Sequence, residues 1–185
     1  MYPRHRTYEE LPELQDTYFI RKFYADTADD GSDYFAGVTY IEGDGLCYIL
    51  DLLYTQEPME VTEPLSAQMI CDDKVEYALI ESNNGGKGFA REVQRLVNTD
   101  PSGHMCNIDW FHQSNNKEAR IFSNANKVMN RVIFPHNWRE RWPEAYTHFT
   151  TFMREGKNEH DDLEDMLTGI VEHIDTAIDE QDGVW

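Results

Sequence analysis

Apolar and polar positions alternate along the first third of the chain in a pattern that predicts β-strands. Three such runs are rich in aromatic and β-branched residues, and turn-forming residues separate them. The second and third runs are joined by Gly43-Asp44-Gly45, which is typical of a tight hairpin. The pattern therefore predicts three antiparallel strands, at 18–26, 34–42 and 46–54.

After Pro58 the apolar residues recur at helical spacing, and shorter apolar runs lie between the helical segments. Further strands are predicted at 75–81, 105–111 and 131–134. Helices are predicted after the candidate cap Thr62, after Gly88, at about 117–130, after Pro143 and at about 160–179. An antiparallel opening followed by alternating helices and strands predicts an α/β fold, in which helices flank a mixed sheet.

Residues 1–17 are polar and predict no regular element. We interpret them as a leader or as the remnant of an interdomain linker, and we expect 18–185 to form one domain. With 185 residues and 40% hydrophobic content, the chain is long enough for a hydrophobic core. It lacks an apolar run of membrane-spanning length and an N-terminal signal peptide, so we expect a cytoplasmic protein without a membrane partner.

The net charge of -19 argues against tight binding of nucleic acid, because phosphate binding normally requires a basic surface. The charge is unevenly distributed, however. Between residues 84 and 145 there are nine basic and six acidic residues, so this segment is weakly basic. Any affinity of the chain for DNA is expected to be weak and sensitive to salt.

Three groups of acidic residues stand at the ends of predicted elements. Asp26 closes the first strand, Glu81 closes a later buried strand, and His160-Asp161-Asp162-Leu163-Glu164-Asp165 opens the last helix. Carboxylates at neighbouring strand ends and at a helix start can converge in space. Converged, they could bind two Mg²⁺ or Mn²⁺ ions, which activate water and stabilise the leaving oxygen in phosphodiester hydrolysis.

Each group also has an ordinary structural explanation. Asp26 could serve turn chemistry, Glu81 could be exposed at a sheet edge, and acids at a helix start complement the helix dipole. Two other sites are excluded. Gly37 stands where a calcium loop from Asp26 needs its bidentate glutamate, and Lys87 is followed by Gly88 where a phosphate loop needs serine or threonine.

Helix geometry ranks the acids of the last group. Asp162 borders the apolar stripe, whereas Asp165 lies about 60° further toward the opposite side. We therefore expect Asp162 to reach the strand ends more easily and Asp165 to be a second ligand or a helper. Asp161 remains an alternative ligand, and His160 could position water or a leaving group.

Four segments taken in order resemble the C-terminal nuclease domain of phage terminase large subunits. They are 24–34, 80–91, 117–121 and 160–167, and the resemblance spans about residues 18–175. It implies an RNase H-like mixed sheet, with three antiparallel strands followed by parallel strands, related to Holliday-junction resolvases. The implied activity is metal-dependent endonucleolytic cleavage of concatemeric double-stranded viral DNA during genome packaging.

The resemblance also implies roles for single residues. Asp26 would be the first metal ligand, Glu81 the second, and Asp162 with Asp165 the third group, for Mg²⁺ or Mn²⁺. The candidate phosphate contacts, each of which could equally be a solvated surface charge, are Lys87, Lys117, Arg120 and Arg131. The implied partners are double-stranded DNA, a terminase ATPase domain or subunit, the small terminase subunit and the portal protein, in the host cytoplasm. Two alternatives remain, a junction-resolving nuclease of the same fold and a non-catalytic acidic module that docks on a packaging motor.

Overall fold

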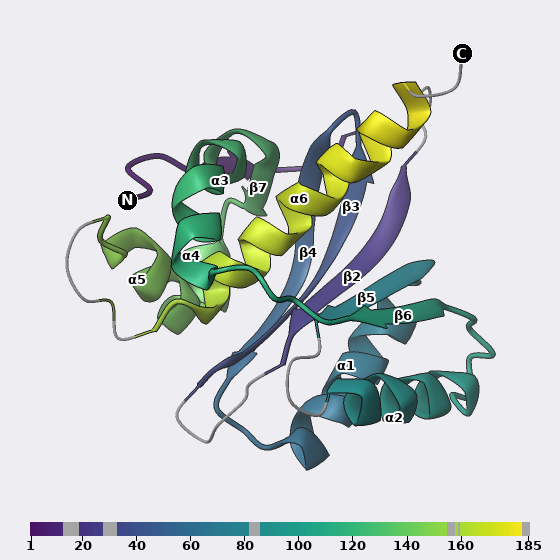
Figure 1. Cartoon of the computed structure of the whole chain (residues 1–185). Helices are drawn as coiled ribbons and strands as arrows, with labels where there is room; N and C mark the ends of the chain where they lie inside the picture. The colour runs from purple at the N-terminus through teal and green to yellow at the C-terminus, as the bar shows by residue number, and fades with distance from the viewer. Residues whose placement is uncertain (13–18, 28–32, 82–85, 155–157, 159, 183–185) are drawn as a thin grey trace.

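A seven-stranded sheet with helices on both faces forms the protein (Figure 1). The computed structural model describes residues 1–12, 19–27, 33–81, 86–154, 158 and 160–182, with only the backbone of 86 and 175–182. The strands are β1 (Arg6–Tyr8), β2 (Ile20–Asp26), β3 (Phe35–Gly43), β4 (Leu46–Thr55), β5 (Tyr77–Glu81), β6 (Asn107–Phe111) and β7 (Val132–Pro135). The helices are α1 (Met59–Asp72), α2 (Gly86–Asn98), α3 (Lys117–Arg131), α4 (Trp138–Arg141), α5 (Pro143–Thr151) and α6 (Asp162–Asp182). None of the described helices is both long enough and apolar enough to cross a membrane.

The order of the strands is β1-β7-β4-β3-β2-β5-β6. The first three long strands pair antiparallel, β2 with β3 and β3 with β4. The later strands pair parallel: β5 with β2, β6 with β5, and β7 with β4. The structure thus confirms the predicted mixed sheet, with its antiparallel opening and its parallel continuation.

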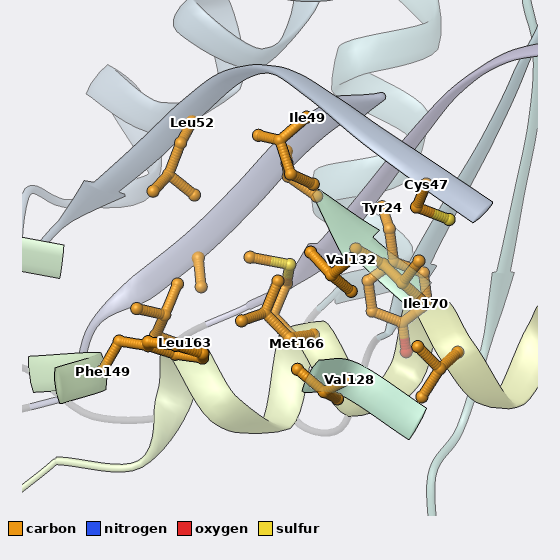
Figure 2. Packing of buried hydrophobic residues seen from close by; sticks show 14 of the residues in the cluster. Tyr24, Cys47, Ile49, Leu52, Val128, Val132, Phe149, Leu163, Met166 and Ile170 are labelled. Carbon is orange, nitrogen blue, oxygen red and sulfur yellow. The ribbon is translucent and has the colours of Figure 1, made fainter. Parts of the chain in front are cut away.

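Both faces of the central strands are buried, and each face carries its own core. On β2, Tyr24 belongs to the cluster under α3, α5 and α6, whereas its neighbours Phe23 and Ala25 belong to the cluster under α1 and α2. Figure 2 shows the first cluster, where Leu163 and Met166 of α6 lie near strand residues such as Ile49. Alternate side chains of one strand therefore anchor both helical layers.

Residues 1–12 are part of the fold, which the polar composition of the N-terminal segment did not predict. Residues 6–8 form β1 at the sheet edge, parallel to β7. Tyr2 is 3% exposed, and its ring stacks on Phe149 at a centroid distance of 4.4 Å. A three-residue strand and one buried ring are too short to give a periodic signal, so sequence patterns missed them.

Two helices also differ from the prediction. Helix α1 begins at Met59 rather than after Thr62, because Pro58 occupies the N-cap position and its carbonyl accepts from the Val61 and Thr62 amides. Thr62 is buried inside this helix rather than capping it. The single-turn helix α4 was not predicted, since four residues are too few to show a helical period.

Helix α6 lies close against β2 at a glycine. A Cβ built on Gly169 would stand 2.2 Å from the Tyr24 hydroxyl oxygen and 2.3 Å from its Cζ. The same Tyr24 hydroxyl donates a hydrogen bond to Glu81. Gly169 therefore sets how closely the helix that carries the third acidic group approaches the strands that carry the first two.

We predict that Gly169→Ala destabilises the protein by about 2 kcal/mol, because the added methyl group must displace a buried ring or the helix itself. The free energy of unfolding, measured by urea denaturation, checks this. Gly88→Ala is the matched control, since a Cβ there meets nothing within 4 Å. That substitution should be neutral or stabilise by up to about 1 kcal/mol. Equal stability of the two variants would contradict the close approach.

Candidate active site

Two buried carboxylates lie side by side at the ends of adjacent parallel strands. Asp26 ends β2, Glu81 ends β5, and the two residues are register partners in the sheet. They are 7% and 1% exposed. The Tyr24 hydroxyl donates to Glu81 Oε2 at 3.0 Å, and the Thr27 hydroxyl donates to the Glu81 carbonyl at 3.1 Å. Parallel pairing thus brings together acids that are 55 residues apart in sequence.

The first turns of α6 bring two more carboxylates to the same place. Asp162 and Asp165 are 6% and 3% exposed. Asp162 Oδ2 accepts a hydrogen bond from the Tyr34 amide at 3.1 Å. A pocket of about 100 Å³ joins them with the strand ends, and it is lined by Asp26, Thr27, Asp33, Glu81, Gln113, Asn115, Lys117, Arg120, Asp162 and Asp165.

The expected difference between Asp162 and Asp165 is not observed. Helical projection placed Asp165 toward the side opposite the apolar stripe, yet it is at least as buried as Asp162. The reason is that every residue from 162 to 171 is buried, so α6 has no solvent face in this part. Both aspartates therefore face protein, and both line the pocket.

Two cationic side chains of α3 lie among these acids. Lys117 Nζ is 2.8 Å from Asp162, 3.0 Å from Asp161, 3.8 Å from Asp26 and 3.9 Å from Asp165. The α3 N-cap fixes the start of this helix, because the Asn116 side chain accepts from the Ala119 amide at 2.9 Å. In this structure Lys117 is thus the counter-ion of four carboxylates rather than a surface charge.

Arg120 bridges the deeper acids. Its Nη1 is 3.1 Å from Asp165 and 3.8 Å from Glu81, and its Nη2 is 2.9 Å from Glu172. The 3.1 Å contact is an ion pair without a well-aligned hydrogen bond, since Asp165 Oδ1 and Arg120 Nη1 are buried and each lacks a hydrogen-bond partner among the described residues. The Asp165 carboxylate therefore retains a buried oxygen that is free to accept.

Burial dominates the electrostatics of the pocket. It raises the pKa of Asp26 well above its usual value, although Lys117 opposes the shift and Glu81 adds to it. Burial likewise raises the pKa of Asp165 to about 7, against the attraction of Lys117 and Arg120. For Lys117, burial lowers the pKa, but Asp26, Asp162 and Asp161 more than compensate, so its pKa is raised. Asp26 and Asp165 therefore resist ionisation, and the lysine stays charged.

The donor set fits a hard divalent cation. Asp and Glu oxygens are the ligands that Mg²⁺ and Mn²⁺ prefer, and the ammonium of Lys117, within 4 Å of four carboxylates, already supplies one positive charge to the pocket. Within the part of the chain that the structure describes, no three acidic, histidine or cysteine side chains are already arranged to enclose a metal ion. Lys117 and Arg120 stand between the acids, so metal binding requires a local rearrangement of these side chains.

The remaining predicted site residues lie at or beyond the rim of the pocket. Asp161 reaches Lys117 but its side chain is 41% exposed. His160 is not among the pocket-lining residues. It stacks on His148 at 5.2 Å and lines a second cavity of about 140 Å³ with Thr151, Phe152 and Asn158. The structure therefore places His160 beside the carboxylates rather than among them.

The other two predicted phosphate contacts are further away. Lys87 lies on the first turn of α2, with Nζ 5.8 Å from the centre of the Trp110 ring. Arg131 is the last residue of α3, which is about 20 Å along the helix from Lys117. Sequence reasoning missed Gln113 and Asn115 as pocket residues. The predicted strand ending at Phe111 could have indicated them, because polar residues after it reach the same sheet edge.

Known proteins resemble this chain in structure but not detectably in sequence. No protein-family model matches the sequence, and no curated protein matches it. The structure is similar to that of the manganese-soaked human cytomegalovirus terminase nuclease domain, with a TM-score of 0.62 and 11% identity over 94% of this chain and 90% of that one.

Two proteins from viruses that infect bacteria have a similar structure. One is a mutant nuclease domain of the large terminase subunit gp2 of bacterial virus Sf6 with manganese and beta-thujaplicinol, with a TM-score of 0.54 and 11% identity over 82% of this chain and 87% of that one. The other is the large terminase of a thermophilic bacteriophage, with a TM-score of 0.60 and 10% identity over 92% of this chain but 43% of that one. The chain therefore has the fold of terminase nuclease domains, which confirms the predicted RNase H-like sheet.

Proposed function

We propose that this chain is a divalent-metal-dependent endonuclease that cleaves concatemeric double-stranded DNA during viral genome packaging. The observation that carries the proposal is the convergence of four buried carboxylates, from β2, β5 and α6, in one pocket. Burying like charges together is costly unless a cation compensates them. The shared fold with manganese-soaked terminase nuclease domains supports the same interpretation.

Asp26, Glu81, Asp162 and Asp165 would hold the metal, with Asp161 as the alternative ligand at the rim. In a two-metal site, bound Mg²⁺ or Mn²⁺ lowers the pKa of a water molecule and stabilises the departing oxygen of the phosphodiester. The hydrogen bond from Tyr24 orients Glu81, and the amide of Tyr34 orients Asp162. His160, near the pocket, would position water or the leaving group.

Lys117 and Arg120 have two uses in this proposal. Without metal they neutralise the carboxylates, as the ion pairs indicate. When metal takes over that role, both cations remain close enough to contact a phosphate, which is the part that the resemblance assigned to them. Lys87 and Arg131 would then contact DNA outside the pocket. The partners proposed for the chain are the terminase ATPase domain or subunit, the small subunit and the portal protein, in the host cytoplasm.

The proposal is tested by incubating the purified chain with supercoiled plasmid. Nicked or linear product is expected with Mn²⁺ or Mg²⁺, and none with EDTA. Calorimetric titration of Mn²⁺ gives an independent readout, since a nuclease site must bind the ion. A folded protein that neither binds Mn²⁺ nor cleaves DNA would favour the non-catalytic interaction module instead.

Lys117→Gln should lower the stability of the protein without metal and increase the stabilisation that Mn²⁺ provides. Without metal, four carboxylates lose their shared cation, and we expect a loss of about 1–2 kcal/mol, which allows for the 36% exposure of Lys117. With Mn²⁺, the gain in melting temperature should exceed that of wild type, because no ammonium competes for the acids. Lys127→Gln, on an exposed position of the same helix, is the control. An equal gain with Mn²⁺ in both variants would contradict the competition.

A further inference from the structure

The edge strand β6 carries an exposed aromatic ring on the face of the sheet that α2 covers. Trp110 is 42% exposed, and no other Phe, Tyr or Trp side chain that the structure describes is as exposed. Its register partner on β5 is Ile80, and the next pair along is Phe111 with Glu81. The ring therefore stands one strand position before the level of the buried carboxylates, on the face of the sheet that α2 covers, whereas Phe111 and Glu81 lie on the face that α6 covers.

The chain continues from this ring into the pocket. Gln113, three residues after Trp110, and Asn115, five residues after it, both line the carboxylate pocket. In Figure 1, β6 forms the outer edge of the sheet and lies over α2. A strand of DNA that enters the pocket past Gln113 and Asn115 would thus pass the edge on which Trp110 lies.

A cation accompanies the ring. Lys87 Nζ lies 5.8 Å from the centre of the Trp110 ring, within the range of a cation–π contact, and Lys87 itself is exposed. An exposed indole with a neighbouring ammonium offers a flat surface for a base and a positive charge for the adjoining phosphate. The ordinary explanation is that the stem of Lys87 merely shields an apolar ring from water.

The charge of the whole chain favours a role in binding. At a net charge of -19, long-range attraction of phosphates is weak, so a nuclease of this composition needs a contact that does not depend on charge. Stacking of a base on an aromatic ring is such a contact, and it is worth about 1–3 kcal/mol per base.

We propose that Trp110 and Lys87 form a subsite for one unpaired nucleobase and its phosphate, around the β6 edge from the pocket in which the phosphodiester is cut. This rests on the proposed nuclease function and names the state of its substrate. Bases within an intact duplex are stacked on each other and cannot lie on the ring. The subsite therefore requires a strand that is frayed, unpaired or displaced at the cut.

The test measures binding without cleavage. Fluorescein-labelled oligothymidylate of 12 nucleotides and a 12-base-pair duplex are titrated with protein in EDTA, and anisotropy is recorded. We expect Trp110→Ala to weaken binding of the single strand roughly 5- to 100-fold and binding of the duplex less than about twofold. Trp110→Phe, which keeps a ring, should stay within about threefold of wild type. Lys87→Gln should lose affinity mainly at low salt.

Trp142→Phe is the control, since that ring lies against Arg141 at 4.2 Å and does not line the pocket. Its affinities should equal those of wild type. Unchanged single-strand binding in Trp110→Ala, or no measurable binding of either oligonucleotide, would overturn the subsite and favour a protein partner at the β6 edge. If only the subsite is wrong, wild type still cleaves plasmid although Trp110→Ala binds the single strand normally. If only the nuclease function is wrong, wild type does not cleave plasmid although Trp110→Ala still weakens single-strand binding.

Discussion

Asp26→Asn and Glu81→Gln are expected to abolish metal-dependent DNA cleavage, with a loss of about a thousandfold or more. Metal ions supply several kcal/mol of transition-state stabilisation, and each 1.4 kcal/mol is a factor of ten in rate. Both substitutions keep the size of the side chain and remove an ionic ligand from the pocket. Initial rates of plasmid nicking in Mn²⁺ measure the loss.

The same Asp26→Asn variant should be at least as stable as wild type when metal is absent. Burial raises the pKa of Asp26 well above its usual value, so its charged form costs free energy in the folded state. A neutral amide avoids that cost, although it gives up the 3.8 Å ion pair with Lys117. Activity and stability thus change in opposite directions, which distinguishes loss of a ligand from loss of the fold.

Asp51→Asn is the matched control for this experiment. Asp51 is a partly exposed aspartate on β4, paired with Arg141 at 3.2 Å, and does not line the pocket. It should keep wild-type cleavage. Retention of more than about a tenth of the wild-type rate in Asp26→Asn would remove that residue from the proposed ligand set.

The sequence predicted the position of the acids better than their environment. Strand ends can be found from period-two patterns and turn residues, so Asp26 and Glu81 were both placed correctly at strand ends that converge. Their convergence follows from parallel pairing, which the alternation of helices and strands indicates. The fold could therefore be predicted from local patterns and the resemblance.

The partners of the acids could not be predicted in this way. The position of Lys117 against four carboxylates depends on how α3 packs across α6, and no local pattern encodes that packing. Arg120 pairs with Glu172, which lies seven residues after Asp165 and thus on the same face of α6. A helix wheel shows that shared face but does not show which helix covers it.

The helix projection of α6 gave a wrong expectation for Asp162 and Asp165 for a similar reason. The projection assumes one solvent face, whereas α6 is covered along its first turns by strands on one side and by α3 and α5 on the other. Glu164 is the clearest case. It belongs to the acidic start of the helix, yet it is 0% exposed, and neither of its carboxylate oxygens has a hydrogen-bond partner within the described structure.

The second large effect that we predict comes from the buried acids Asp165 and Glu164. Without metal, the protein should lose stability as the pH rises. Burial raises the pKa of Asp165 to about 7 and that of Glu164 to about 8. Between these values and the normal carboxyl range, the folded state binds more protons than the unfolded state. The free energy of unfolding must then fall as pH rises. Between pH 6.5 and 8.5 we expect a decrease on the order of 2 kcal/mol, or about 4–8 °C in melting temperature.

The pH range and the variants isolate this effect. Burial lowers the pKa of His5 and His173, which gives the opposite slope, but only below about pH 6.5. Thermal melts in EDTA from pH 6.5 to 8.5 should decline for wild type and less steeply for Asp165→Asn and Glu164→Gln. Mn²⁺ should stabilise more at pH 8.5 than at 6.5, because it competes with protons for the carboxylates. A melting temperature in EDTA that is constant or rises over this range would show that the buried acids ionise normally, and would remove the electrostatic reason for metal at this site.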